Sequence, residues 1–258
     1  MPELIEVEMY RRAAEAAIGE TISTVYAPDS WYLKRGTTAD ALSDTLVGET
    51  VVAARRRGKL LLLEVGDATL GLRFGMTGRI IVDGGAPIDE LLYSSRRADA
   101  ADERFAMTWD GGGLVISDPR RLGGVELAPD EDRLGPDALE LDRRQLTDVL
   151  GRTSRALKAV LLDQSRIAGI GNLICDEVLW RAGLSPVRGA DTLTEFEVAL
   201  LSRCIKLTIA MLMKRGGSHT GDLQDERNRD GRCPRDGTAL RRDDVGGRTT
   251  YWCPEHQR

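Results

Sequence analysis

Four side chains near the C-terminal end of the sequence have the types and the spacing of a metal site. Cys233 and Asp236 form one pair with two residues between them, and Cys253 and His256 form a second pair with the same spacing. Two such pairs, carried by a hairpin that turns at 246–247, can place four donors around one zinc ion. We therefore predict one structural Zn²⁺ bound by these four residues. The alternative is a hairpin held by packing alone, with Asp236 as an ordinary turn residue.

The first residues of the sequence can supply a nucleophile. Removal of Met1 would leave Pro2 with a secondary α-amine, which is partly neutral near pH 7 because α-amines titrate at roughly 7.7–8.0. A neutral amine can attack a sugar carbon and form an iminium, as lysine Schiff-base enzymes do with carbonyls. Glu3 and Glu6 would supply proton transfer beside it. The other interpretation makes Pro2 only the first residue of a helix with an acidic first turn.

Turns rich in glycine carry two further candidates. Lys59 follows Gly58 and opens a very apolar strand, so its ammonium would project from a rigid edge. Met76 lies between Gly75 and Gly78, and an unbranched apolar side chain on such a loop can enter a base stack as a wedge. The ordinary interpretations are a surface lysine and a core methionine beside a turn.

Two adjacent arginines, Arg120 and Arg121, follow a proline-fixed turn and can reach a base edge and a phosphate together. Leu122 comes next and can fill space beside them. A glycine turn at 169–171 leads into a periodic helix at Asn172, where exposed backbone amides and the Asn172 side chain can bind phosphate. The alternatives are a solvated pair of charges for Arg120 and Arg121, and a simple helix start for the segment at Asn172.

Taken in order, these motifs resemble those of the formamidopyrimidine-DNA glycosylase and endonuclease VIII family. The opening Met-Pro-Glu-Leu-Ile-Glu-Val-Glu is similar to the family's Met-Pro-Glu-Leu-Pro-Glu-Val-Glu. Residues 74–78 and 118–123 resemble its Leu-Gly-Met-Thr-Gly and Asp-Pro-Arg-Arg-Phe-Gly loops, and the resemblance extends from residue 2 to residue 256. The departures replace a proline, a leucine, a phenylalanine and two of four cysteines, at Ile5, Phe74, Leu122, Asp236 and His256.

The resemblance implies a bifunctional DNA glycosylase and abasic-site lyase. Such an enzyme excises oxidised bases and nicks the strand by β,δ-elimination through a Schiff base on its N-terminal proline. Its partner is double-stranded DNA with a damaged base or an abasic site, and we expect a monomer. The catalytic residues implied are Pro2, Glu3, Glu6 and Lys59. The DNA-binding residues implied are Met76, Arg120, Arg121, Leu122, Lys158, Asn172 and Arg248, of which Lys158 and Arg248 would contact phosphate.

Two other functions remain open on the sequence. Ile5 and Leu122 leave room for a non-catalytic protein that binds damaged or abasic DNA on the same scaffold. A third possibility is an abasic-site lyase without glycosylase activity. The segment 217–233 is also shorter than the loop that covers an oxidised purine in formamidopyrimidine enzymes, which makes 8-oxoguanine a less firm expectation.

The elements that must position these residues indicate an α+β fold. Apolar periodicity predicts helices over 3–18, 144–150, 154–162, 172–182 and 194–213, and short strands over 50–52, 60–65, 70–74, 105–109 and 114–116. Strands over 238–243 and 249–252 would form the zinc hairpin. We expect an N-terminal helix and β-sandwich domain (1–127), a linker (128–143), a helix–two-turns–helix domain (144–215) and the zinc-finger hairpin (216–258).

Composition is that of an ordinary globular protein, with 258 residues, 41% hydrophobic and 30% charged. The longest apolar runs are too short to cross a bilayer, and the acidic N-terminus lacks a signal pattern, so we expect a cytoplasmic location. The net charge of −5 argues mildly against nucleic acid. Basic residues at 55–59 and 120–121 are nevertheless separate from the acidic stretch 130–142, and local potential decides attraction to phosphate.

Overall fold

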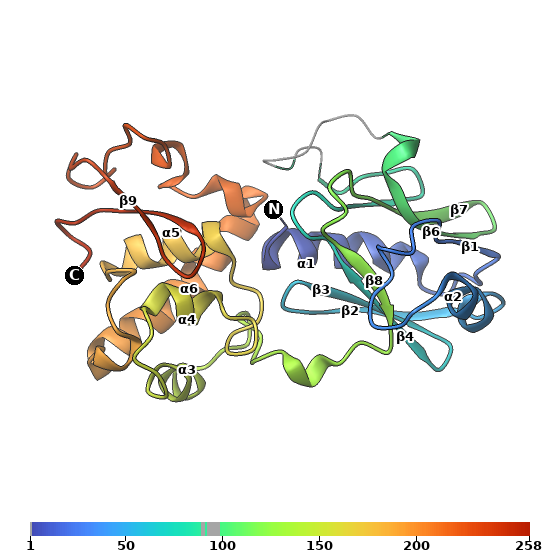
Figure 1. The fold of residues 1–258 in the computed structure, drawn as a ribbon, viewed down its shortest axis with the longest axis horizontal. Helices are drawn as coiled ribbons and strands as arrows, with labels where there is room; N and C mark the ends of the chain where they lie inside the picture. Colours follow the sequence, from blue (N-terminus) through green and yellow to red (C-terminus); the bar gives the residue numbers. More distant parts are fainter. Residues whose placement is uncertain (1, 89–90, 92–98) are drawn as a thin grey trace. The chain divides into compact units, whose positions relative to one another are not determined.

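The computed structural model describes residues 2–88, 91 and 99–258 (Figure 1). Internal contacts divide the chain into two units. The first contains Pro2 and Glu6–Glu131, and the second contains Glu3–Ile5 and Asp132–Arg258. Helix α1 (Leu4–Ala14) therefore contributes residues to both units. The mixture of helices and antiparallel strands confirms the predicted α+β class.

The first unit contains two four-stranded antiparallel sheets. One has the order β1 (Thr24–Tyr26), β6 (Glu103–Trp109), β7 (Gly112–Ser117), β5 (Arg79–Val82), and the other has the order β2 (Val51–Arg57), β3 (Leu60–Val65), β4 (Ala68–Arg73), β8 (Gly124–Leu127). One apolar core joins Leu61 and Leu70 of the second sheet, Phe105 and Ile116 of the first, and Tyr10 of α1. Because β3 is a central strand covered on both faces, its four leucines are all buried and do not alternate with polar residues.

The sequence patterns missed several short elements of this unit. Helix α2 (Ala39–Leu46) begins after Thr38, whose hydroxyl accepts a hydrogen bond from the Ala41 amide at 3.1 Å. This is an ordinary N-cap signal. Strands β1, β5 and β8 are too short to give a clear alternation. Helix α1 ends four residues earlier than its predicted end at 18, and a 3₁₀ turn (Glu15–Ala17) follows it.

The second unit is built on four helices and one hairpin within the described residues. They are α3 (Arg143–Leu150), α4 (Leu157–Leu162), α5 (Asn172–Ala182), α6 (Glu195–Arg215), β9 (Arg241–Asp244) and β10 (Thr249–Trp252). Short 3₁₀ helices occur at Ala100–Asp102 in the first unit and at Glu131–Arg133, Ala190–Thr192, Ser218–Thr220 and Gln224–Glu226. None of the helices in the described part of the chain has the length and apolarity that a membrane span requires.

Local capping explains the ends of these helices. Helix α6 begins with a capping box in which the Thr194 amide donates to Glu197 at 2.8 Å and the Glu197 amide donates to the Thr194 hydroxyl at 3.3 Å. It ends at Gly216, whose φ of +94° favours glycine. Helix α4 begins three residues later than predicted, because Ala156 instead forms an antiparallel bridge with Gly189.

Candidate functional site

The four predicted metal ligands come together in the second unit. Each offers one ligand atom, and these four atoms lie within 4.8 Å of one another. His256 Nδ1 is 3.4 Å from Cys233 Sγ and 3.3 Å from Asp236 Oδ2, and Asp236 Oδ2 is 3.3 Å from Cys253 Sγ. Ligands at about 2.0–2.3 Å from a tetrahedral zinc would lie about 3.3–3.8 Å apart. The cluster therefore has the dimensions of a zinc site.

The atoms that would not bind metal are held by neighbouring groups. His256 Nε2 lies 3.1 Å from the Trp180 carbonyl, which can only accept, so Nε2 carries the proton and Nδ1 presents its lone pair. Asp236 Oδ1 accepts the Thr238 amide at 2.9 Å, which leaves Oδ2 for a metal and keeps the pKa of Asp236 well below its usual value. The Trp180 indole donates to Cys233 Sγ at 3.5 Å. This donor set fits zinc.

The predicted hairpin turn carries Arg248. Strand β9 begins at Arg241, three residues later than expected, and Thr249 of β10 pairs with Asp244. Gly246 and Gly247 have φ of +64° and +69°, as a tight turn requires. Arg248 follows them and is exposed.

Glu3 is buried, and its carboxylate caps helix α5. Its oxygens accept the Leu173 and Ile174 amides at 2.9 and 3.1 Å. Gly171 makes this possible, because a Cβ at that position would collide with Glu3 Cδ. The sequence predicts the amides at this helix start as phosphate donors, and that prediction is wrong for Leu173 and Ile174, because Glu3 already occupies their amides. Pro2, which precedes Glu3, is buried, and so is Glu6 on α1.

The prediction that Lys158 contacts phosphate is also wrong. Lys158 is fully buried, and its ammonium lies 2.5 Å from Asp176 Oδ1 and 2.7 Å from Thr250 Oγ1. A side chain without exposed surface cannot reach a DNA backbone. Asp176, which also accepts from Arg227, was missed as a site residue because nothing in the sequence links it to the hairpin.

Asn172 binds the hairpin as well. Its Nδ2 donates to the Thr249 carbonyl at 3.1 Å. Its Oδ1 is buried and has no hydrogen-bond partner within the described residues. One N–H of the Asn172 side-chain amide, which was predicted to bind phosphate, therefore donates to β10. Its second N–H is the one that a ligand could use.

In the first unit, the loop of Met76 and the loop of Arg120 and Leu122 lie against each other. The Thr77 hydroxyl donates to Asp118 Oδ1 at 2.6 Å. A Cβ at Gly75 would collide with the Leu122 carbonyl carbon, so only glycine fits. Met76 is half-buried, whereas Leu122 and Arg120 are exposed. The structure thus brings together the two loops that carry Met76, Arg120 and Leu122.

Arg121 is held in a strained backbone conformation with φ of +55°. Its guanidinium donates to both oxygens of Asp29 at 2.6 Å, and this pairing lowers the pKa of Asp29. Trp31, two residues beyond Asp29, is 68% exposed, with Lys34 Nζ 5.1 Å from its ring. The pairing of Asp29 with Arg121 was not predicted, because the two residues lie far apart in the sequence.

Lys59 occupies the turn that joins β2 and β3, as predicted. Arg57 pairs with Leu60 across this turn, and Gly58 has φ of +59°. Lys59 is half-buried there.

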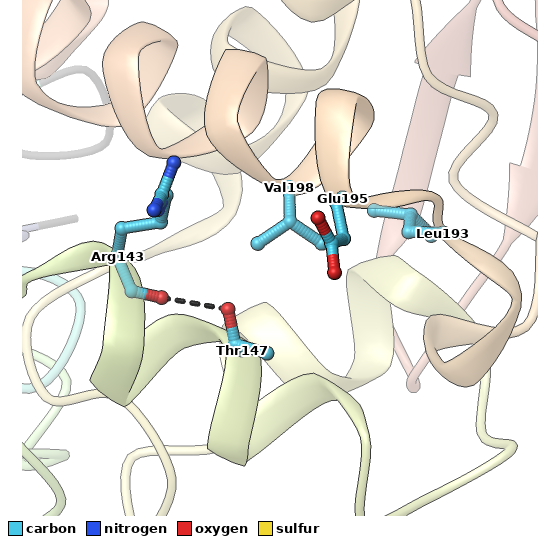
Figure 2. A pocket seen from close by; sticks show the side chains of 5 residues that line it. All are labelled: Arg143, Thr147, Leu193, Glu195 and Val198. Carbon is cyan, nitrogen blue, oxygen red and sulfur yellow. Dashed lines mark hydrogen bonds between the residues drawn. The ribbon is translucent and has the colours of Figure 1, made fainter.

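A pocket of about 240 Å³ lies between α3 and α6 (Figure 2). Its lining residues are Arg143, Thr147, Leu193, Glu195 and Val198. None of these is a predicted site residue, and Thr147 uses its hydroxyl to donate to the Arg143 carbonyl.

Comparison with known protein families gives matches to both units. Residues 1–125 match the model of the formamidopyrimidine-DNA glycosylase N-terminal domain. Residues 134–223 match the model of the formamidopyrimidine-DNA glycosylase H2TH domain.

Similar proteins and structures match over almost the whole chain. A formamidopyrimidine-DNA glycosylase of Bacillus cereus (strain ZK / E33L) is 34% identical, with 98% of each chain covered. One of Carboxydothermus hydrogenoformans is 33% identical over 100% of each. A solved complex of Lactococcus lactis Fpg with DNA containing an abasic site has a TM-score of 0.84 and 28% identity, again over 100% of each chain. A complex of a mutant of the Lactococcus lactis protein with DNA containing Fapy-dG has the same TM-score, identity and coverage.

Proposed function

Because this chain belongs to the formamidopyrimidine-DNA glycosylase family and is a DNA glycosylase, we propose that it is bifunctional. It excises an oxidised base from double-stranded DNA and then nicks the strand at the abasic site. The observation that carries the proposal is that the carboxylate of Glu3 is fixed by two hydrogen bonds. Glu3 directly follows Pro2, so a carboxylate able to transfer protons lies on the residue next to the proposed nucleophilic amine. Solved relatives bound to abasic-site DNA support the substrate class.

The mechanism follows from the chemistry of the two residues. After Met1 is removed, the neutral amine of Pro2 attacks C1′ of a flipped nucleotide, and the damaged base leaves. The sugar ring then opens as the C1′–O4′ bond breaks and O4′ takes a proton, which leaves an iminium between C1′ and the Pro2 nitrogen. This iminium acidifies the 2′ position, so that β-elimination and then δ-elimination break the strand on both sides. Glu3 transfers protons, because a carboxylate has more lone pairs than the two that accept backbone amides. Glu6 is the second carboxylate proposed, and Lys59 assists opening of the sugar.

The DNA contacts divide into gap-filling and phosphate-binding residues. Met76, Arg120 and Leu122 would occupy the space left by the flipped base, and the adjacency of their loops supports this assignment. Arg121, Asn172 and Arg248 would bind phosphates. Leu122 can fill space but cannot stack as an aromatic ring does, so we expect weak discrimination of the opposite base.

We propose a single structural zinc ion in the second unit. Cys233, Asp236, Cys253 and His256 would hold it, and it would fix the hairpin that carries Arg248. Elemental analysis of the purified protein should give about one zinc per chain. Alanine at His256 should remove most of the bound zinc, and protein that folds without any zinc would contradict the proposal.

A panel of duplexes tests the function. The panel contains 8-oxoguanine, formamidopyrimidine, thymine glycol, dihydrouracil and an abasic site, each analysed on a denaturing gel. We expect excision and nicking of at least one modified base, with β,δ-elimination products. Nicking of abasic DNA alone would indicate a lyase without glycosylase activity. Binding without any turnover would indicate a non-catalytic damage-binding protein.

A further inference from the structure

The only described lysine with no exposed surface lies beneath the hairpin of the second unit. Lys158, on α4, has 0% relative exposure, and its partner Asp176, on α5, has 2%. Burying an ammonium and a carboxylate is costly unless both are paired and hydrogen-bonded. Asp176 meets this condition, because Oδ1 binds Lys158 and Oδ2 binds Arg227. Because a buried ion pair contributes little net stability, the presence of this pair calls for another explanation.

The lysine connects directly to the backbone of the hairpin arginine. Lys158 Nζ donates to Thr250 Oγ1 at 2.7 Å, and Thr250 Oγ1 in turn donates to the carbonyl of Arg248 at 3.0 Å. Thr250 is itself fully buried. The charge of Asp176 is thus joined to the Arg248 peptide by a continuous series of hydrogen bonds.

Neighbouring contacts restrain the same end of the hairpin. The Thr249 carbonyl accepts from Asn172 at 3.1 Å, and the Tyr251 amide lies 3.4 Å from Asp176 Oδ2. The turn also packs on α4, since a Cβ at Gly246 would lie 3.1 Å from Ala159 Cα. The backbone on both sides of Arg248 is therefore fixed, while the Arg248 side chain is exposed.

We propose that Asp176, Lys158 and Thr250 form a buried relay that holds Arg248 in its DNA-binding position. Lys158 and Thr250 are then positioning residues, which act on DNA only through Arg248. This inference rests on the proposed function, which assigns Arg248 to the DNA backbone. An ordered backbone lowers the entropy that an arginine loses on binding phosphate, so loss of the relay should weaken binding.

A double-mutant cycle tests the relay. The probe is a duplex with a tetrahydrofuran abasic-site analogue, and the readout is the dissociation constant from fluorescence anisotropy. The variants are T250V, which removes one hydroxyl at constant shape, R248A, and the two combined. We expect R248A to weaken binding about tenfold or more and T250V about three- to tenfold. In the R248A background, T250V should change binding less than about twofold.

Controls separate positioning from folding. T249V makes the same substitution one residue away and keeps the Thr249 carbonyl, so binding should stay within about twofold of the wild type. If T250V fails to fold, K158M replaces it, because Asp176 then keeps Arg227 as its partner. Equal weakening by T250V with and without Arg248 would overturn the relay. Unchanged binding by R248A would instead overturn the assignment of Arg248 itself, and the relay with it.

Discussion

Two exposed arginine loops of this chain are each anchored by a buried aspartate, but the two aspartates have different partners. In the first unit, Asp118 is fully buried and its carboxylate accepts from neutral donors, among them the Thr77 hydroxyl and the Gly123 amide at 2.6 and 2.8 Å. In the second unit, Asp176 is paired with the buried ammonium of Lys158. Neutral donors hold the carboxylate of Asp118, whereas cationic side chains hold that of Asp176. The comparison indicates that removal of either carboxylate should loosen a loop, at very different cost to folding.

The largest expected effect is that of D176N. The substitution leaves Lys158 buried without its counter-charge, and removal of one partner of a buried pair typically costs about 3–5 kcal/mol. Urea unfolding should show a loss of this size in the free energy of unfolding. A loss below about 1 kcal/mol would contradict the assignment of Asp176 as the counter-charge of a buried Lys158 ammonium.

The matched change in the first unit is D118N. An amide NH₂ would then face a donor whose hydrogen bond Asp118 now accepts. The buried groups left without a partner should lower the free energy of unfolding by about 1–3 kcal/mol. The same urea titration should therefore place D118N between the wild type and D176N. Equal losses for the two variants would contradict the distinction between neutral and charged anchoring.

A partly exposed ion pair, that of Glu197 with Arg188, can be compared with the buried pair of Asp176 through the pH dependence of stability. The ion pair with Arg188 and the Thr194 amide lower the pKa of Glu197 from 4.5 to about 2. Because the folded pKa is the lower one, its contribution is complete above pH 4.5 and is lost as the pH falls towards 2. Water screens this partly exposed pair, so the stability difference between wild type and E197Q should be about 1 kcal/mol at pH 7 and should shrink by pH 3. A difference independent of pH would contradict this.

The smallest expected effect concerns the exposed Arg121–Asp29 pair. D29A should release Arg121 and remove one negative charge, so duplex DNA should bind a few-fold more tightly. The slope of log K against log salt should become steeper by up to the amount expected for about one additional phosphate contact. Weaker binding by D29A would show instead that Asp29 holds the loop in its binding conformation. Anisotropy titrations at several salt concentrations measure both quantities.

Local patterns predicted the parts of the fold that depend on neighbours in the chain. The apolar run of β3, the periodic helices α5 and α6 and the glycine turn at 246–247 all have local causes, and the structure contains them. The clustering of Cys233, Asp236, Cys253 and His256 was also predictable, because their paired spacing requires only a hairpin. The missed helix α2 had only a threonine cap as its signal.

Long-range partners were not predictable from the sequence. Lys158 looked like a phosphate ligand because its own segment does not reveal the burial imposed by Thr250 and Asp176. The α5 amides looked available because Glu3 lies far away in the sequence. In both cases the fold supplied an internal partner where sequence reasoning had placed DNA. Local patterns therefore indicated the segments of a candidate site, and tertiary contacts decided which of their groups face outward.

Covalent trapping tests the central claim most directly. Borohydride reduction during reaction with lesion-containing duplex should link the protein to DNA, and peptide mass spectrometry should place the link on Pro2 of chains that have lost Met1. P2G with the same processing should trap and nick far less. Full trapping by P2G, or active protein that retains Met1, would contradict the account.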